Sequence, residues 1–378
     1  MIKRLRIRNF KAFRDQELEF APLTLLAGLN GSGKSSVLQS LLLLRQSYNQ
    51  GLLHEGRLAL DGDLLRLGTF QDALFEGASQ ERLGLDILLD DGGRENALTW
   101  VFEFGSKDDR VSQRIENSAG GCLPDVSLFG QRFCFLSAER IGPRLNYRVS
   151  DLDFSVVRFG IRGEWTAQYL AACKDQGLLL GRCFHPSAVS GRLLNQVEAW
   201  MSEFSPGLRV EAEADPERDS VRLRYRFEAR RGVSNSYRAT NVGFGISYTL
   251  PVVVAVLASH PGDLILLEAP EAHLHPRGQS KLGELLARAA SDGVQIIVET
   301  HSDHVMNGVR VAVHEDLISP GTAQFLYFQW DPKKEDGATG VEKIVMDDHG
   351  RVETWPAGFF DEMDRNLEIL LAEKSPAQ

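Results

Sequence analysis

The chain has 378 residues, of which 43% are hydrophobic and 25% are charged, and its formal net charge is −10 at pH 7. This length and composition predict a folded protein with a large core, in one large domain or two lobes, and exclude a disordered chain. Proteins that coat polyanions without specificity are basic, so any contact with nucleic acid would come from a local basic patch.

Targeting signals and cysteine pairs are not evident in the sequence. The longest apolar run, 250–258, is too short to cross a membrane, and the first ten residues lack the apolar region of a signal peptide. The cysteines show no C-x-x-C spacing, so they fit neither a disulfide framework nor a thiolate zinc site. We therefore expect a reduced, cytoplasmic protein that has no contact with a membrane.

The N-terminal part of the chain predicts strands, a glycine loop and a helix. Apolar and basic residues alternate over 2–9, which predicts a strand with one solvent-facing side. The run 18–28 predicts a second strand that leads into the loop, and 34–48 predicts a helix. A hairpin is expected over 82–104 around a D-D-G-G turn. The polar stretch 105–121 predicts an exposed insertion.

The rest of the chain alternates apolar strands with helices. A strand is expected at 133–142, helices between 160 and 206, and a hairpin at 208–231. The elements expected after these are a buried helix at 249–259, a strand at 263–268, a helix at 277–290, a strand at 294–300, a helix at 303–313 and, after short strands, a last helix at 359–373. This alternation predicts an α/β fold with a mainly parallel core sheet, in which ligands bind at the carboxyl ends of the strands.

The strongest motif is the segment GLNGSGKSS, which fits G-x-x-x-x-G-K-[ST] between a predicted strand and a predicted helix. Glycines let the backbone amides of such a loop point at phosphate oxygens, Lys34 supplies a positive charge, and the Ser35 hydroxyl is a ligand for Mg²⁺. The residues that we expect to bind the nucleotide phosphates are Asn30, Gly31, Ser32, Gly33, Lys34, Ser35 and Ser36.

Two later segments supply further candidate site residues. Glu268 follows four apolar residues and is the expected carboxylate on the metal side of the phosphate loop. His301 ends the next strand, from where it could reach a γ-phosphate. His273 and His275 lie near Glu271, which makes a zinc site conceivable, but the i, i+4 spacing of a helical zinc pair is missing.

Together these segments resemble the ATP-binding-cassette (ABC) ATPases of the SMC, RecF and OLD type. The opening IKRLRIRNFKAF precedes the phosphate loop as it does in that family, LILLEAPEAHLHP resembles its Walker B and D-loop segment, and ETHSDH resembles its switch-histidine loop. NVGFGISYTLP lies where the family has its signature loop. The resemblance is strongest to short SMC-like ATPases of the AAA family that carry a C-terminal domain of unknown function, several of which lie in bacterial anti-phage loci.

The resemblance implies an ABC-type ATPase head with a parallel core sheet, an antiparallel β-subdomain and a helical lobe. It implies three parts, 1–158, 159–258 and 259–378, and the cofactors ATP and Mg²⁺. It also implies a homodimer that forms head to tail on ATP, in which Gly243, Gly245 and Ser247 contact the γ-phosphate on the partner subunit. Gln71 would be the Q-loop ligand of the metal, beside Ser35 and Glu268.

The sequence also departs from this family in two ways. OLD nucleases add a Toprim domain and SMC proteins add long coiled coils, and neither is evident here. We therefore expect an ATPase that regulates a co-encoded effector protein, for example a nuclease, in anti-phage defence. The alternatives are a RecF-like ATPase of DNA repair or recombination, and a module that holds ATP without hydrolysing it. A dinucleotide oxidoreductase is disfavoured, because the motif is not G-x-G-x-x-G.

The residue after Glu268 predicts slow hydrolysis. Most ATPases of this type have a catalytic glutamate there, which orients the attacking water, whereas this chain has Ala269. Either Glu271 takes over this role, or no base remains and ATP is held for long periods.

A basic cluster on the second strand of the 208–231 hairpin leaves two interpretations open. Its arginines are Arg222, Arg224 and Arg226, followed by Arg230, Arg231 and Arg238. Either the acidic run 211–219 neutralises them, or they bind the DNA backbone or an acidic partner. Near the N-terminus, Lys11 is a candidate to lie close to the phosphates.

Overall fold

The computed structural model describes residues 1–104, 111–114, 126–150, 159–230, 232–330 and 337–372. Within them, a six-stranded sheet at the centre has the order β16-β15-β3-β14-β13-β7 and is parallel except for the pair β15–β16. Its strands are β3 (Leu23–Gly28), β7 (Phe133–Leu136), β13 (Leu264–Glu268), β14 (Gln295–Glu299), β15 (Ala323–Gln329) and β16 (Gly340–Ile344). The parallel strands are continuous apolar runs because both faces of the sheet are covered.

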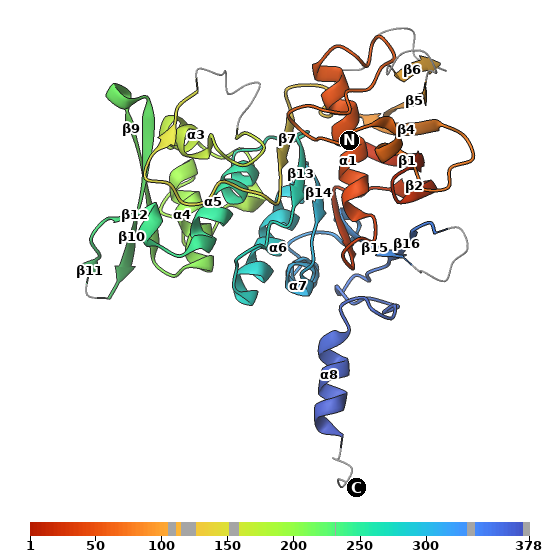
Figure 1. Cartoon of the computed structure of the whole chain (residues 1–378). Coiled ribbons are helices and arrows are strands. Elements are labelled where there is room, and N and C mark those ends of the chain that lie inside the picture. The colour runs from red at the N-terminus through yellow and green to blue at the C-terminus, as the bar shows by residue number, and fades with distance from the viewer. Residues whose placement is uncertain (105–110, 115–125, 151–158, 231, 331–336, 373–378) are drawn as a thin grey trace, which may run out of the picture.

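An antiparallel sheet covers helix α1 (Lys34–Asn49), which separates it from one face of the core sheet (Figure 1). The order is β2-β1-β4-β5-β6, with β1 (Ile2–Phe10), β2 (Phe13–Glu19), β4 (Arg82–Asp91), β5 (Arg94–Phe104) and β6 (Val111–Arg114). Ile2, Leu5 and Ile7 of β1 are buried against α1, while the arginines between them are exposed, as the alternation predicted. The short helix α2 (Phe70–Ala73) lies beside this sheet.

A helical lobe extends from the other side of the core sheet (Figure 1). It contains α3 (Thr166–Cys173), α4 (Leu193–Phe204) and α5 (Phe244–Leu257). An antiparallel sheet packs on these helices, built on β9 (Leu208–Asp215) and β10 (Ser220–Ala229), with the short strands β8 (Tyr147–Arg148), β11 (Gly232–Val233) and β12 (Tyr237–Arg238). One continuous apolar cluster joins the lobe to the core sheet, so the two share a core.

Helices α6 (Pro276–Ser291) and α7 (Asp303–His314) pack against each other at two glycines. A Cβ atom on Gly283 would lie 2.1 Å from the carbonyl oxygen of Val305, and one on Gly308 would lie 1.9 Å from that of Ser280. No side chain fits at either position, so the two backbones touch directly.

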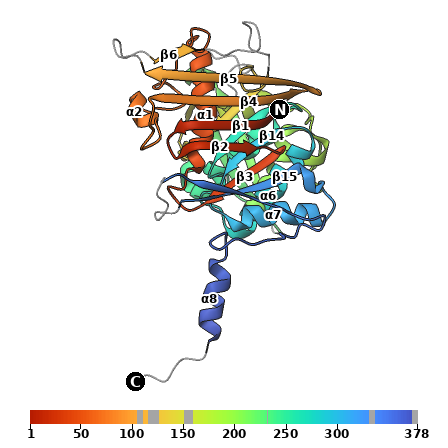
Figure 2. The same cartoon turned by 90° about the vertical axis from the view of Figure 1, so that its right-hand side faces the viewer.

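Helix α8 (Glu362–Leu371) points away from the rest of the molecule (Figures 1 and 2). None of its residues is buried, and the apolar side chains of Ile369, Leu370 and Leu371 are exposed. Among the described helices, none combines the length and the apolar character that crossing a membrane requires.

The parallel core, the antiparallel sheet and the helical lobe confirm the predicted fold class, whereas several element bounds differ. The expected strand 18–28 is two strands, because Pro22 lacks an amide hydrogen and the chain passes there from one sheet to another. The helix expected at 249–259 begins at Phe244 and continues through Pro251, and the strand expected at 133–142 ends at Leu136. Most of the expected insertion 105–121 lies outside the described residues.

Candidate nucleotide-binding site

The phosphate loop connects β3 to α1, and two of its glycines are required by close contacts. Gly28 has φ 144°, and a Cβ there would lie 2.4 Å from the carbonyl oxygen of Phe328 on the neighbouring strand β15. Gly33 has φ 94°, and a Cβ there would lie 2.8 Å from the Cβ of Ala12 in the β1–β2 turn. The loop therefore lies tightly between the core sheet and the antiparallel sheet.

Lys34 and Ser32 are the most deeply buried polar residues of the loop. The Lys34 Nζ donates hydrogen bonds to the carbonyl oxygens of Gly28 at 2.9 Å and Leu29 at 2.7 Å. Burial lowers the pKa of Lys34, and the nearby charge of Glu299 opposes that shift. The Ser32 hydroxyl is buried and has no hydrogen-bond partner among the described residues. Phosphate oxygens would provide acceptors for both groups.

The predicted loop residues surround one cavity of about 380 Å³. The loop and the start of α1 contribute Asn30, Gly31, Gly33, Lys34, Ser35 and Ser36 to its lining. The β1–β2 turn contributes Lys11 and Ala12, and the remaining lining residues are Gln39, Glu299 and His301. The structure thus brings Lys11 and His301 to the phosphate loop. Two further residues of the cavity were not expected from the sequence: Glu299, and Gln39, which accepts a hydrogen bond from the Lys11 Nζ at 2.8 Å.

Two glutamates lie side by side where β13 and β14 end, and they face different neighbours. Glu268 and Glu299 are paired in register across these strands. The Ser35 hydroxyl donates a hydrogen bond of 2.9 Å to Oε1 of Glu299. Glu268 instead accepts a bond of 3.1 Å from the amide of Ala138, just beyond β7. Burial raises the pKa of both carboxyl groups. The acid in contact with the predicted metal ligand Ser35 is therefore Glu299.

The segment after Glu268 has a constrained backbone. Ala269 has φ 40° and donates its amide hydrogen to the carbonyl oxygen of Glu299 at 2.8 Å. Oε1 of Glu271 accepts a hydrogen bond of 2.8 Å from the amide of His301, and its Oε2 is buried without a hydrogen-bond partner in the described part of the chain. Helix α6 is capped by the side chain of His275, so Glu271 holds the His301 loop and does not cap this helix.

The signature-like loop starts helix α5 and packs on the segment after Glu268. Gly243 is the N-cap of α5, and a Cβ there would meet nothing within 4 Å. A Cβ on Gly245 would lie 2.5 Å from the carbonyl oxygen of His273, and the ring of Phe244 lies 5.0 Å from the His273 ring, centroid to centroid. Ser247 lies one turn inside the helix and is only 5% exposed.

The contacts of Gln71 do not support its expected role as a metal ligand, and the described residues do not form the zinc site that the histidine spacing already disfavoured. Gln71 is exposed on α2, donates a hydrogen bond to Glu81 and does not line the cavity. No group of three or more His, Cys, Asp or Glu residues in the described part of the chain is placed to hold a metal ion, so His273 and His275 do not form a zinc site with Glu271.

The basic cluster on β10 is largely paired with acids. Arg222 lies 3.7 Å from Asp215, and Arg226 lies 2.6 Å from Glu211, both acids being on the neighbouring strand β9. This arrangement fits the interpretation that the two strands neutralise each other. Arg231 lies outside the described residues.

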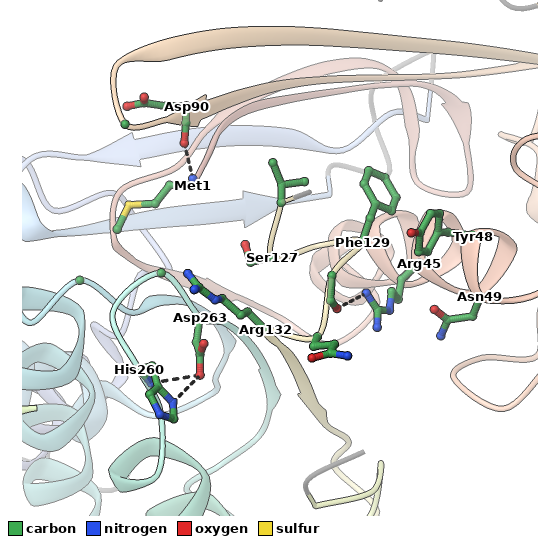
Figure 3. Close-up of a pocket in the computed structure, with 16 residues that line it drawn as sticks. Met1, Arg45, Tyr48, Asn49, Asp90, Ser127, Phe129, Arg132, His260 and Asp263 are labelled. Atoms are coloured by element: carbon green, nitrogen blue, oxygen red, sulfur yellow. Dashed lines mark hydrogen bonds and ion pairs between the residues drawn. The ribbon is translucent and has the colours of Figure 1, made fainter. Parts of the chain in front are cut away.

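A larger cavity, of about 1150 Å³, lies at the amino ends of the parallel strands (Figure 3). Arg132 and the hydrogen-bonded pair His260 and Asp263 line one side, and Arg45 lines the other. The Arg45 guanidinium is already bonded to the carbonyl oxygens of Leu128 and Gly130. In α/β folds ligands bind at the carboxyl ends of the strands, which favours the smaller cavity at the phosphate loop.

The donor set at the phosphate loop fits a nucleoside triphosphate with Mg²⁺. The loop supplies amide groups at the start of a helix, a buried lysine and an unpaired serine hydroxyl, which are groups that bind phosphate oxygens. Mg²⁺ is held in such sites by one or two oxygen ligands from the protein together with the phosphates, and Ser35 and a carboxylate are in contact here.

Models of known protein families match three stretches of the chain. Residues 1–91 match an AAA ATPase domain, and residues 199–307 match an AAA domain described as putative AbiEii toxin, type IV TA system. Residues 318–370 match a protein of unknown function, DUF3696. The first stretch contains the phosphate loop, the second contains the signature-like loop, Glu268 and His301, and the third reaches into α8. No curated protein matches the chain.

The fold is similar to solved structures of SMC head domains. One is an SMC head bound to the C-winged helix domain of ScpA, with a TM-score of 0.56, 14% identity and coverage of 92% of this chain and 98% of that chain. Another is an SMC head with an extended coiled coil, bound to the C-terminal domain of ScpA derived from Pyrococcus furiosus, with a TM-score of 0.55, 13% identity and coverage of 98% of each chain. The chain thus carries stretches that match two AAA-type ATPase domain models and DUF3696, on a fold similar to that of SMC head domains.

Proposed function

We propose that the chain binds ATP with Mg²⁺ at the phosphate loop and hydrolyses it slowly. The observation that carries this proposal is that Lys34, Ser35, Lys11 and His301, from three separate segments, line one cavity. The loop amides and Lys34 hold the β- and γ-phosphates, and His301 stabilises charge at the γ-phosphate. When bound, Mg²⁺ neutralises part of the phosphate charge.

Slow hydrolysis follows from the residue beside Glu268. The methyl group of Ala269 can neither accept a proton nor orient water, and a general base typically contributes about a hundredfold to ten-thousandfold in rate. The nearest substitute is Glu271, whose Oε2 is buried without a hydrogen-bond partner among the described residues and whose Oε1 is bonded to the His301 amide. We expect an ATP-bound state with a long lifetime.

ATP also drives the pairing of two heads in this proposal. The start of α5 does not line the cavity of its own chain, and the space around Gly243 is open. Gly243 and Gly245 then complete the site of the partner, where the N-terminus of α5 faces the γ-phosphate. Phe244 and Leu29, both exposed, are available for burial between the heads.

The paired heads regulate a co-encoded effector protein, and we place this activity in anti-phage defence. Two similar SMC heads are described as bound to domains of ScpA, which supports a role for such heads as platforms for a second polypeptide. The description of one matched model as part of a toxin–antitoxin system supports an effector function.

Nucleotide binding is tested by titrating a fluorescent ATP analogue in Mg²⁺ against wild type, Lys34→Ala and the control Lys174→Ala, an exposed lysine on the helical lobe. Loss of charged hydrogen bonds at Lys34 should weaken binding about tenfold or more, while the control binds as wild type does. Equal affinity of all three proteins would contradict the proposal.

Pairing is tested by light scattering with and without ATP and Mg²⁺. Gly243→Asp places a negative charge where the partner's γ-phosphate would lie, so it should abolish the dimer and leave nucleotide affinity intact. Gly177→Asp is the control, because its Cβ would also meet nothing within 4 Å. If Lys34→Ala pairs as well as wild type, ATP does not drive the association.

A further inference from the structure

The hydroxyl of Ser35 contacts a carboxylate to which the sequence analysis assigned no role. Ser35 donates a hydrogen bond to Glu299 at 2.9 Å. Strand β14 lies between the phosphate-loop strand β3 and the strand β13, and the register aligns Leu26, Glu299 and Glu268 across the three strands. Glu299 is therefore one strand closer to the phosphate loop than Glu268 is.

Glu299 is buried, with an exposure of 8%. The charges of Lys34 and His301 lie nearby, but neither forms an ion pair with its carboxylate in the described chain. The closest candidate, Lys34, donates instead to the carbonyl oxygens of Gly28 and Leu29. Buried carboxylates are normally paired with a cation or coordinate a metal. Because Glu299 lines the nucleotide cavity, a metal entering with the nucleotide can reach it.

We propose that Glu299 is a carboxylate ligand of the nucleotide-bound Mg²⁺, beside Ser35. It would take the role of metal ligand that the family resemblance implied for Gln71. This inference rests on the proposed nucleotide binding. Gln71 is exposed and bonded to Glu81, whereas Glu299 already contacts the other metal ligand. One or two carboxylates with phosphate oxygens and waters form a common Mg²⁺ site. Glu268, bonded to the Ala138 amide, is left one strand further from Ser35.

The test measures the binding of the metal ion independently of ATP turnover. Mn²⁺ replaces Mg²⁺, and electron paramagnetic resonance follows its binding to the protein in the presence of saturating ADP. Wild type should bind Mn²⁺ more tightly than ADP alone does, and Glu299→Gln should lose about tenfold or more of that Mn²⁺ affinity. Nucleotide affinity without metal, measured in EDTA, should be unchanged or higher, because a negative charge beside the phosphates is removed.

Two controls and one further variant make the result decisive. Glu198→Gln alters another glutamate of 8% exposure, in the helical lobe, and Gln71→Ala removes the side chain expected from the motif. Both should bind Mn²⁺ as wild type does. Glu299→Asp keeps the charge and should bind Mn²⁺ better than Glu299→Gln.

Several outcomes overturn the inference while nucleotide binding stands. One is a Glu299→Gln protein that binds ADP and holds Mn²⁺ as wild type does. A second is tighter Mn²⁺ binding by this variant, which would mean that Glu299 competes with the metal for Ser35. A third is a Glu299→Asp protein that binds Mn²⁺ no better than Glu299→Gln. Failure of wild type to bind ADP at all is a different result, because it rejects the nucleotide site itself.

Discussion

The Nη2 of Arg140 donates a hydrogen bond of 2.6 Å to the carbonyl oxygen of Ala269. The same buried guanidinium donates to the carbonyl oxygens of Ser137, Glu268 and Tyr248, and it lies over the Tyr248 ring. Burial lowers the pKa of Arg140 to about 10. One side chain thus connects the end of β7, the segment after β13 and the signature-like helix α5.

Arg140→Leu should lower the free energy of unfolding by about 3 kcal/mol or more, because several buried carbonyl groups lose their donor. Urea denaturation measures this. The control is Arg162→Leu, an exposed arginine paired with Glu139, for which a loss below about 1 kcal/mol is expected. Equal stability losses in the two variants would show that Arg140 is not the connection described above.

Gly33→Ala should destabilise the protein more than Gly31→Ala. Both glycines have positive φ, which costs an alanine about 1–2 kcal/mol. Only at Gly33 does the added Cβ also collide with Ala12, whereas at Gly31 it meets nothing within 4 Å. In thermal or urea unfolding, Gly33→Ala should therefore be the less stable of the two variants. The reverse order would mean that the β1–β2 turn does not press on the phosphate loop.

Ala269→Glu should raise ATP turnover about a hundredfold and shorten the lifetime of the ATP-bound dimer, because it restores the missing carboxylate. The backbone at φ 40° is equally unfavourable for alanine and glutamate, so folding should be little affected. Steady-state phosphate release measures the rate, with Ala272→Glu as the control. If the wild type hydrolyses ATP fast and Ala269→Glu does not change the rate, the segment after Glu268 is misassigned.

Glu271→Gln should reduce turnover and leave nucleotide affinity unchanged. Glutamine keeps an oxygen that can accept the bond from the His301 amide, so the loop stays in place while the negative charge is removed. Single-turnover hydrolysis separates the chemical step from binding. Unchanged turnover would limit Glu271 to holding the His301 loop.

The phosphate loop could be predicted because its chemistry is contained in contiguous residues, and Gly28 to Ser36 lie where the motif placed them. Glu299 was missed because its contact with Ser35 depends on β14 lying between β3 and β13, a strand order that one sequence does not reveal. A signal was nevertheless present, since Glu299 ends a buried apolar strand just as Glu268 does. The start of α5, rich in glycine, was interpreted as a loop, whereas the helix already begins at Phe244 and includes Ser247.

The contact between α6 and α7 at Gly283 and Gly308 bears on how a conformational change would be transmitted from the nucleotide site. The segment holding Ala269 and Glu271 leads into α6, and the loop holding His301 leads into α7. Because the backbones of α6 and α7 touch at these glycines, sliding one helix past the other would push the carbonyl groups of Ser280 and Val305 against the facing backbone. We therefore expect the two helices to move as one rigid pair, so that a displacement at either loop would shift both.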